Sequence, residues 1–114
     1  MEELNDTNGV SFINDQSFNN WVIVFKHSTR CSISSMALSR FESQLAALEN
    51  VAKVYYLDLI KFRNISNELA NFYKIEHESP QVLVVKNGIC VYNASHMAIK
   101  PSTLLLSIAS FKNN

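Results

Sequence analysis

The stretch that decides the fold is Trp21-Val22-Ile23-Val24-Phe25-Lys26-His27-Ser28-Thr29-Arg30-Cys31-Ser32-Ile33-Ser34. Its first five residues are continuously apolar and mostly β-branched, which is typical of a central strand covered on both faces. From Ile33, near the end of the stretch, to about Glu49, apolar residues recur at helical spacing: Ile33, Met36, Ala37, Phe41, Leu45 and Leu48. The pattern predicts a buried strand that leads through a polar loop into a long helix.

On the N-terminal side of this stretch we predict one short strand and one brief helix. The strand covers residues 10–13 (Val10 to Ile13), and the helix covers residues 15–19, with Asn14 as its cap.

On the C-terminal side, strands and helices continue to alternate. Residues 52–59 form the next buried strand, and Asn64 caps a helix whose inner face is Ile65, Leu69, Phe72 and Tyr73. Residues 81–86 and 89–93 are two strands joined by Asn87-Gly88, a strong signal for a two-residue hairpin. A last helix begins at Pro101 and turns these residues inward: Leu104, Leu105, Ile108 and Phe111.

The predicted order is β-α-β-α-β-α-β-β-α. Strand–helix alternation implies parallel pairing early in the chain, and the tight hairpin imposes antiparallel pairing late. We therefore predict the α/β class, with a central mixed β-sheet flanked by helices, which is the arrangement of the thioredoxin-like fold. A chain of 114 residues has room for one core, so residues 1–114 form a single domain.

Composition excludes several classes of function. Ten basic and ten acidic residues give no net charge, which argues against a general binder of nucleic acid or anionic membrane. No apolar run approaches the ~20 residues of a membrane span. The first residues are acidic and polar, unlike a signal peptide, so we expect a cytoplasmic protein. We also expect it to act as a monomer. In a reducing cytosol we expect no structural disulfide between Cys31 and Cys90.

Cys31 is the candidate nucleophile because it lies where a strand leads into a helix. At or near the N-cap, unpaired backbone N–H groups and the helix dipole favour a thiolate over a thiol, and Arg30 adds a cation. The alternative is that Cys31 is a small buried hydrophobe, as free cysteines often are. Its polar neighbours favour the reactive thiol.

Ser34 occupies the position that holds the second thiol of a Cys-x-x-Cys pair. A serine cannot resolve a mixed disulfide, so any exchange at Cys31 must finish with a free thiol from solution. Its hydroxyl either hydrogen-bonds the thiolate or serves as an ordinary polar residue of the first helical turn.

Ser79-Pro80 directly precedes the strand at residues 81–86. The proline is either a simple turn residue or a cis proline, which is a minority form even at X–Pro bonds. We predict the cis form, with backbone groups left free beside Cys31 to pair with a substrate.

Four blocks together resemble the monothiol bacilliredoxin family, the YtxJ-like general stress proteins of the thioredoxin-fold superfamily: His27-Ser28-Thr29-Arg30-Cys31-Ser32-Ile33-Ser34, His77-Glu78-Ser79-Pro80-Gln81, Lys86-Asn87-Gly88 and Ala94-Ser95-His96. The resemblance runs from about Trp21 to Leu105. It implies a thiol-disulfide oxidoreductase with no bound cofactor, whose co-substrate is bacillithiol or another low-molecular-weight thiol and whose partners are S-thiolated client proteins.

The resemblance also implies roles for individual residues. Cys31 would be the nucleophile that takes over the bacillithiol, and Pro80 the cis proline. We predict Cys31 and Ser34 as catalytic residues, and as substrate-binding residues Thr29, Arg30, Ser32, Ser79, Pro80 and His96. One position departs from the family: Ser32 stands where a proline is common, which restores a backbone N–H in the first turn of the helix.

The other cysteine and the remaining histidines have humbler predicted roles. Cys90 follows the hairpin turn at the far end of the sheet from Cys31, so we expect half-buried packing and no resolving function. His27 orients the loop before Cys31, and His77 shapes the turn before Pro80. The spacing of the cysteines and histidines fits no zinc site, and no metal is expected.

Two other functions compete with mixed-disulfide reduction. One is an interaction protein that binds an extended segment through the Pro80 loop without catalysis. The other is a redox sensor in which Cys31 is capped during oxidative stress without turnover.

Overall fold

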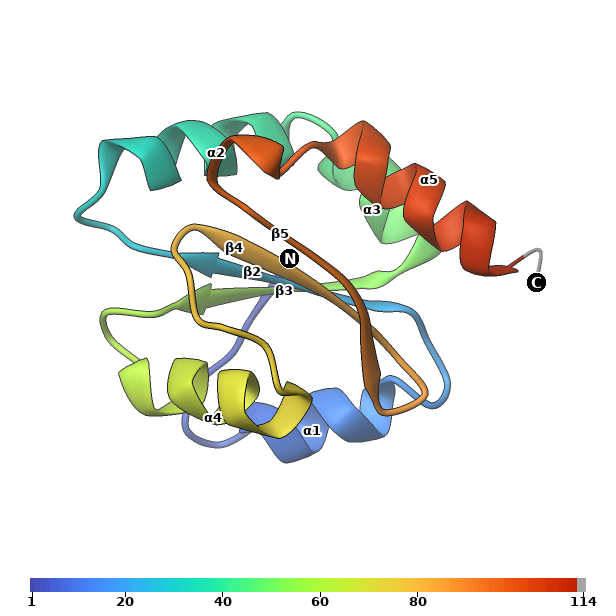
Figure 1. Cartoon of the computed structure of the whole chain (residues 1–114), viewed down its shortest axis with the longest axis horizontal. Coiled ribbons are helices and arrows are strands. Elements are labelled where there is room, and N and C mark those ends of the chain that lie inside the picture. The colour runs from blue at the N-terminus through green and yellow to red at the C-terminus, as the bar shows by residue number, and fades with distance from the viewer. Residues whose placement is uncertain (113–114) are drawn as a thin grey trace.

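The computed structural model describes residues 1–112. A five-stranded mixed sheet lies between two layers of helices (Figure 1). Across the sheet the strands are β1 (Glu2–Glu3), β3 (Lys53–Asp58), β2 (Val22–His27), β4 (Gln81–Lys86) and β5 (Ile89–Ser95). The first three run parallel, β4 runs antiparallel to β2, and β5 runs antiparallel to β4. The predicted α/β class and mixed sheet are confirmed.

The helices divide between the two faces of the sheet (Figure 1). One face carries α2 (Ser32–Glu42), α3 (Leu45–Val51) and α5 (Pro101–Lys112), and the other carries α1 (Gly9–Gln16) and α4 (Arg63–Tyr73). A short 3-10 helix, η1 (His96–Ala98), links β5 to α5. None of the helices within residues 1–112 is long and apolar enough to cross a membrane.

Strand β2 is the centre of the molecule, as its sequence predicts. All six of its residues are buried, and β3 and β4 pair with it on either side. Alternate side chains enter opposite cores: Ile23 and Phe25 pack under α2 and α3, whereas Val22 and Val24 pack against α1 and α4. Burial on both faces is why this strand is continuously apolar.

The Asn87-Gly88 hairpin forms as predicted. Both residues have positive φ, 52° at Asn87 and 77° at Gly88, as a two-residue turn of this type requires. A Cβ on Gly88 would lie 3.0 Å from Cζ of Phe18, so the packing of the turn on α1 also favours glycine.

The predicted strand at residues 10–13 is wrong, and so are the bounds and the cap of the helix predicted at residues 15–19, of which only Asp15 and Gln16 are helical. Residues 10–13 lie inside α1, Asn14 is an internal helical residue, and the N-cap is Asn8. Val10 and Ile13, three residues apart, share the buried face of a helix, a spacing that four residues cannot distinguish from the alternation of a strand. The first strand is instead β1, where two exposed glutamates pair with β3.

The predicted helix at residues 33–49 is two helices, α2 and α3, separated at Ser43 and Gln44. Ala37, Phe41 and Leu48 are buried as expected, but Ile33 and Met36 are 50 % and 63 % exposed. The buried face of α2 is Ser34, Ala37 and Phe41, and Ile33 and Met36 lie off that face.

Three details of the later helices also differ from the prediction. Phe62, not Asn64, is the N-cap of α4. Phe72, predicted on the inner face of α4, is exposed. Phe111, predicted on the inner face of α5, is exposed too, whereas Leu104 and Ile108 of that face are buried.

Phe41 tests the core beneath α2. Its buried ring lies 4.9 Å from that of Phe25, so Phe41→Ala should lower the free energy of unfolding by about 3–5 kcal/mol in urea titration. The matched control Phe72→Ala removes an exposed ring that packs in a T-shaped pair with Tyr73, and should cost about 1 kcal/mol or less. Equal losses in the two variants would contradict this assignment of the core.

Candidate active site

Cys31 is the N-cap residue of α2, as predicted. Its backbone is extended, its carbonyl accepts the Ser35 N–H at 3.1 Å, and its own N–H donates to the carbonyl of Ser28 at 3.2 Å. The Cys31 side chain makes no capping hydrogen bond and is partly exposed. The Cys31 sulfur therefore lies at the start of α2, beside the first-turn N–H groups of the helix, where solvent can reach it.

Ser34 is fully buried, and its hydroxyl is engaged away from Cys31. Ser34 Oγ accepts the N–H of Ser28 at 3.0 Å and lies 2.8 Å from Nδ1 of His27. Within residues 1–112 these are its side-chain hydrogen bonds, so the thiolate bond considered from the sequence is not formed. Ser34 instead ties the first turn of α2 to the end of β2, which holds the loop that carries Cys31.

His27 is the partner that makes this tie specific. Burial lowers its pKa from the usual histidine value, although the carboxylates of Asp58 and Glu42 pull it upward. The imidazole is therefore neutral at pH 7, and the Ser34 hydroxyl can give its proton to Nδ1 while accepting from Ser28. The predicted role of His27, orienting the loop by hydrogen bonds, agrees with this geometry.

The Ser79–Pro80 peptide bond is cis, as predicted. The antiparallel register pairs Lys26 with Gln81, so Pro80 falls opposite His27, the last residue of β2, and Ser79 opposite Ser28 in the loop that leads to Cys31. The Pro80 carbonyl accepts the N–H of His96 at 3.0 Å. Because that carbonyl is already bonded, it is not among the backbone groups left free for a substrate.

Ser79 has an unused polar group at this point. Its Oγ is buried and has no hydrogen-bond partner in the described part of the chain. A buried hydroxyl without a partner is uncommon and requires an explanation.

The remaining predicted site residues surround Cys31 at the sheet edge where β2 ends. Thr29, Arg30 and Ser32 flank it and are exposed, and His96 begins η1, which packs against α2 (Figure 1). The structure thus brings together residues from three separate segments of the chain. Their roles in catalysis or binding stay predictions.

Cys90 lies at the opposite end of the sheet, as predicted. It pairs with Val85, which in turn pairs with Val22 at the start of β2. Its Sγ donates to the Tyr92 carbonyl at 3.3 Å, and burial raises the pKa of the thiol. Both cysteines are free.

Lys26 is the residue that sequence reasoning missed. It is the fifth residue of β2 and is 0 % exposed, an unusual state for lysine. Burial lowers its pKa to about 8. The one sequence signal was a lysine directly after the five apolar residues of a central strand.

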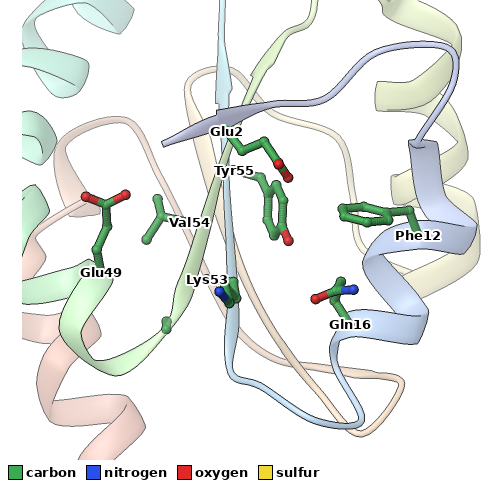
Figure 2. A pocket seen from close by; sticks show the side chains of 8 residues that line it. Glu2, Phe12, Gln16, Glu49, Lys53, Val54 and Tyr55 are labelled. Carbon is green, nitrogen blue, oxygen red and sulfur yellow. The ribbon is translucent and has the colours of Figure 1, made fainter.

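A cavity of about 390 Å³ opens far from Cys31, beside the edge of the sheet where β3 begins (Figure 2). Phe12 and Tyr55 form part of its wall, with ring centroids 5.6 Å apart in a T-shaped arrangement. Lys53, at its base, pairs with the first residue of β2. The cavity therefore lies at the end of the sheet opposite the thiol.

Solved structures establish the fold family. A thioredoxin of Malassezia sympodialis superposes with a TM-score of 0.71 at 16 % identity, over 96 % of this chain and 90 % of that chain. A second structure comes from work on the thiol-resolving mechanism of yeast mitochondrial 1-Cys peroxiredoxin via glutathione/thioredoxin systems. It superposes with a TM-score of 0.71 at 15 % identity, over 96 % of this chain and 94 % of that chain. At these identities the likeness concerns the fold alone, and it confirms the predicted thioredoxin fold.

Two further comparisons reach the family. A candidate oxidoreductase with a thioredoxin fold matches with a TM-score of 0.78 and 30 % identity, covering 93 % of this chain and 91 % of that chain. The family model of the monothiol bacilliredoxin BrxC matches residues 2–104, which include Cys31, Ser34, Pro80 and His96. The chain, a thioredoxin-fold protein of thiol redox chemistry, therefore belongs to the monothiol bacilliredoxin family.

Proposed function

We propose that this protein removes a low-molecular-weight thiol, bacillithiol by family, from mixed disulfides of client proteins, with Cys31 as the only reacting thiol. The observation that carries the proposal is the contrast between the two ends of the Cys-x-x-Ser segment. Cys31 is partly exposed at the start of α2, whereas Ser34 is buried and bonded to His27. The site has a nucleophile and no resolving group.

Two exchanges complete the reaction. The Cys31 thiolate attacks the sulfur of the small thiol, a Cys31–small-thiol disulfide forms, and the client leaves as a thiolate that takes a proton from water. A second small thiol then attacks this disulfide as its thiolate. The second small thiol is thereby oxidised and leaves joined to the first as their disulfide, the client cysteine has been reduced, and Cys31 is released as the thiolate with which the reaction began.

The neighbouring residues support these steps in different ways. The exposed groups of Thr29, Arg30 and Ser32 lie on the approach to the thiol. Ser32 also offers a backbone N–H that a proline would lack, which adds a donor at the N-terminus of α2.

Ser79 and the exposed His96 border the same edge of the sheet, where a client would lie, and we propose that both contribute to its binding. The hydroxyl oxygen of Ser79 itself is buried in the unbound protein. The chemistry needs a pool of reduced small thiol, so we propose that the protein works in the cytoplasm. We also propose that it acts as a monomer, without nucleic acid or membrane partners.

Cys31→Ser should abolish release of bacillithiol from a thiolated client, because serine does not attack disulfides. Cys90→Ser is the matched control and should retain wild-type turnover, since Cys90 is bonded within β5 at the far end of the sheet. Mass spectrometry of both the client and this protein measures the transfer. Turnover in Cys31→Ser would refute the proposal, and an adduct on Cys31 without turnover would indicate a sensor.

Ser34→Ala should loosen the Cys31 loop. It leaves the buried Ser28 N–H and His27 Nδ1 without their partner, which should lower the free energy of unfolding by about 1–3 kcal/mol. Turnover should fall without being lost, because the nucleophile remains. Ser35→Ala, on the exposed side of the same turn, should change neither quantity. A fully active and stable Ser34→Ala protein would contradict the positioning role.

A further inference from the structure

A buried lysine joins the strand that leads to Cys31 to the segment that leads to Pro80. Lys26 Nζ lies 2.7 Å from Nδ1 of His77 and donates to Oε1 of Gln81 at 3.0 Å. The first partner lies three residues before Pro80, and the second lies one residue after it. The two contacts therefore bracket the cis-proline segment.

Gln81 extends the network through the same segment. Its Nε2 donates to the carbonyl of Glu76 at 3.0 Å, and its Oε1 also accepts the N–H of Glu78 at 3.3 Å. The Ser66 hydroxyl of α4 lies 3.3 Å from Nδ1 of His77. Residues 76–81 are thus held to β2 and α4 by side chains that converge on one ammonium group.

Stability alone does not account for this lysine. Within residues 1–112 no carboxylate forms an ion pair with Lys26, and its partners are neutral acceptors. Burying an ammonium without an anion costs free energy, and an apolar residue of similar shape is often neutral or stabilising at such a place. A residue that costs stability and organises a segment beside a reactive group fits a functional role.

We infer that Lys26 is a positioning residue, which holds residues 76–81 in register with β2 so that Ser79 and Pro80 lie where a thiolated client must dock against Cys31. The inference rests on the proposed function. Lys26 itself touches neither the thiol nor a client, because it points into the core on the α4 side of the sheet.

Lys26→Met tests the role because methionine fills similar space without charge. Gln81 Oε1 keeps the Glu78 N–H and His77 keeps Ser66, so the variant leaves no partner unpaired. We expect the Tm to be unchanged or higher, while kcat/KM for a bacillithiolated client falls about 10- to 100-fold, mainly through KM. The alkylation rate of Cys31 with iodoacetamide should stay within about two-fold of wild type, since Lys26 does not touch the thiol.

Two further variants separate positioning from a structural role. Lys53→Met makes the same change on an exposed strand lysine at the far end of the sheet and should retain full activity. His77→Leu removes one acceptor from an exposed position and should lower kcat/KM in the same direction. Combined with Lys26→Met it should add little, since both changes disrupt one network. Full activity in Lys26→Met, or Tm and activity falling together with His77→Leu unaffected, would overturn the inference.

Amide hydrogen exchange gives a readout that does not depend on the reaction. Residues 76–79 should exchange faster in Lys26→Met than in wild type or Lys53→Met. A wild-type protein without dethiolating activity would refute the proposed function. Unchanged exchange in Lys26→Met would refute the positioning role, even if the wild-type protein is active.

The pH dependence of stability provides an independent check on the buried charge. Burial lowers the pKa of Lys26 from 10.5 in the unfolded chain to about 8 in the fold. Between these two values the unfolded chain binds the extra proton, so the free-energy cost of burying Lys26 falls as the pH rises. The charged neighbours of the network are Arg63 on α4 and Glu78, both near His77, whose own pKa is lowered and which stays neutral throughout this range. Any advantage of Lys26→Met in urea unfolding should therefore shrink from pH 8 to pH 10.5. An advantage that grows over that range would contradict the buried cation.

Discussion

Strand β2 is buried along its whole length and hydrogen-bonded on both sides, parallel to β3 and antiparallel to β4. Parallel pairing with β3 needs a crossover, which α2 and α3 provide, so the chain must leave β2 directly into a helix. Antiparallel pairing with β4 makes that strand begin where β2 ends. Cys31 and Pro80 meet at one edge of the sheet as a consequence of these two pairings.

The loop between β2 and α2 is held by polar groups that lie inside the protein. Ser34, His27 and the Ser28 N–H satisfy one another, so the first turn of α2 is anchored from below while the thiol stays open to solvent. A second cysteine in place of Ser34 would lie within this buried cluster, next to an imidazole. The serine gives up internal resolution of a mixed disulfide and keeps the anchor. In the proposed reaction, release of the product then depends on a thiol from solution.

One face of α2 is buried, and this explains the exposed apolar residues beside the site. Ser34, Ala37 and Phe41 follow one another at helical spacing on that face and are buried. Ile33 and Met36 lie off this face and are exposed, so they do not belong to the core. Cys31, directly before the helix, is partly exposed as well.

Local patterns in the sequence determined the class of fold, the central strand, the hairpin at Asn87-Gly88 and the position of Cys31 at a helix start. Each rests on residues next to one another, such as a run of β-branched side chains or a turn that needs positive φ. The short N-terminal elements failed because four residues cannot separate helical from strand spacing, and because β1 gains its pairing from β3 rather than from its own two glutamates.

Only the tertiary structure decided where the polar side chains of the site make their hydrogen bonds. Ser34 to His27, and Lys26 to His77 and Gln81, join residues up to 55 positions apart. The place of Lys26 after an apolar run hints at burial, but nothing local names the partner of any of these groups. Sequence placed Cys31 because a helix terminus is a local feature. The network that supports it arises only when strands from distant parts of the chain pair, because burial in the assembled sheet forces each polar group to find a partner.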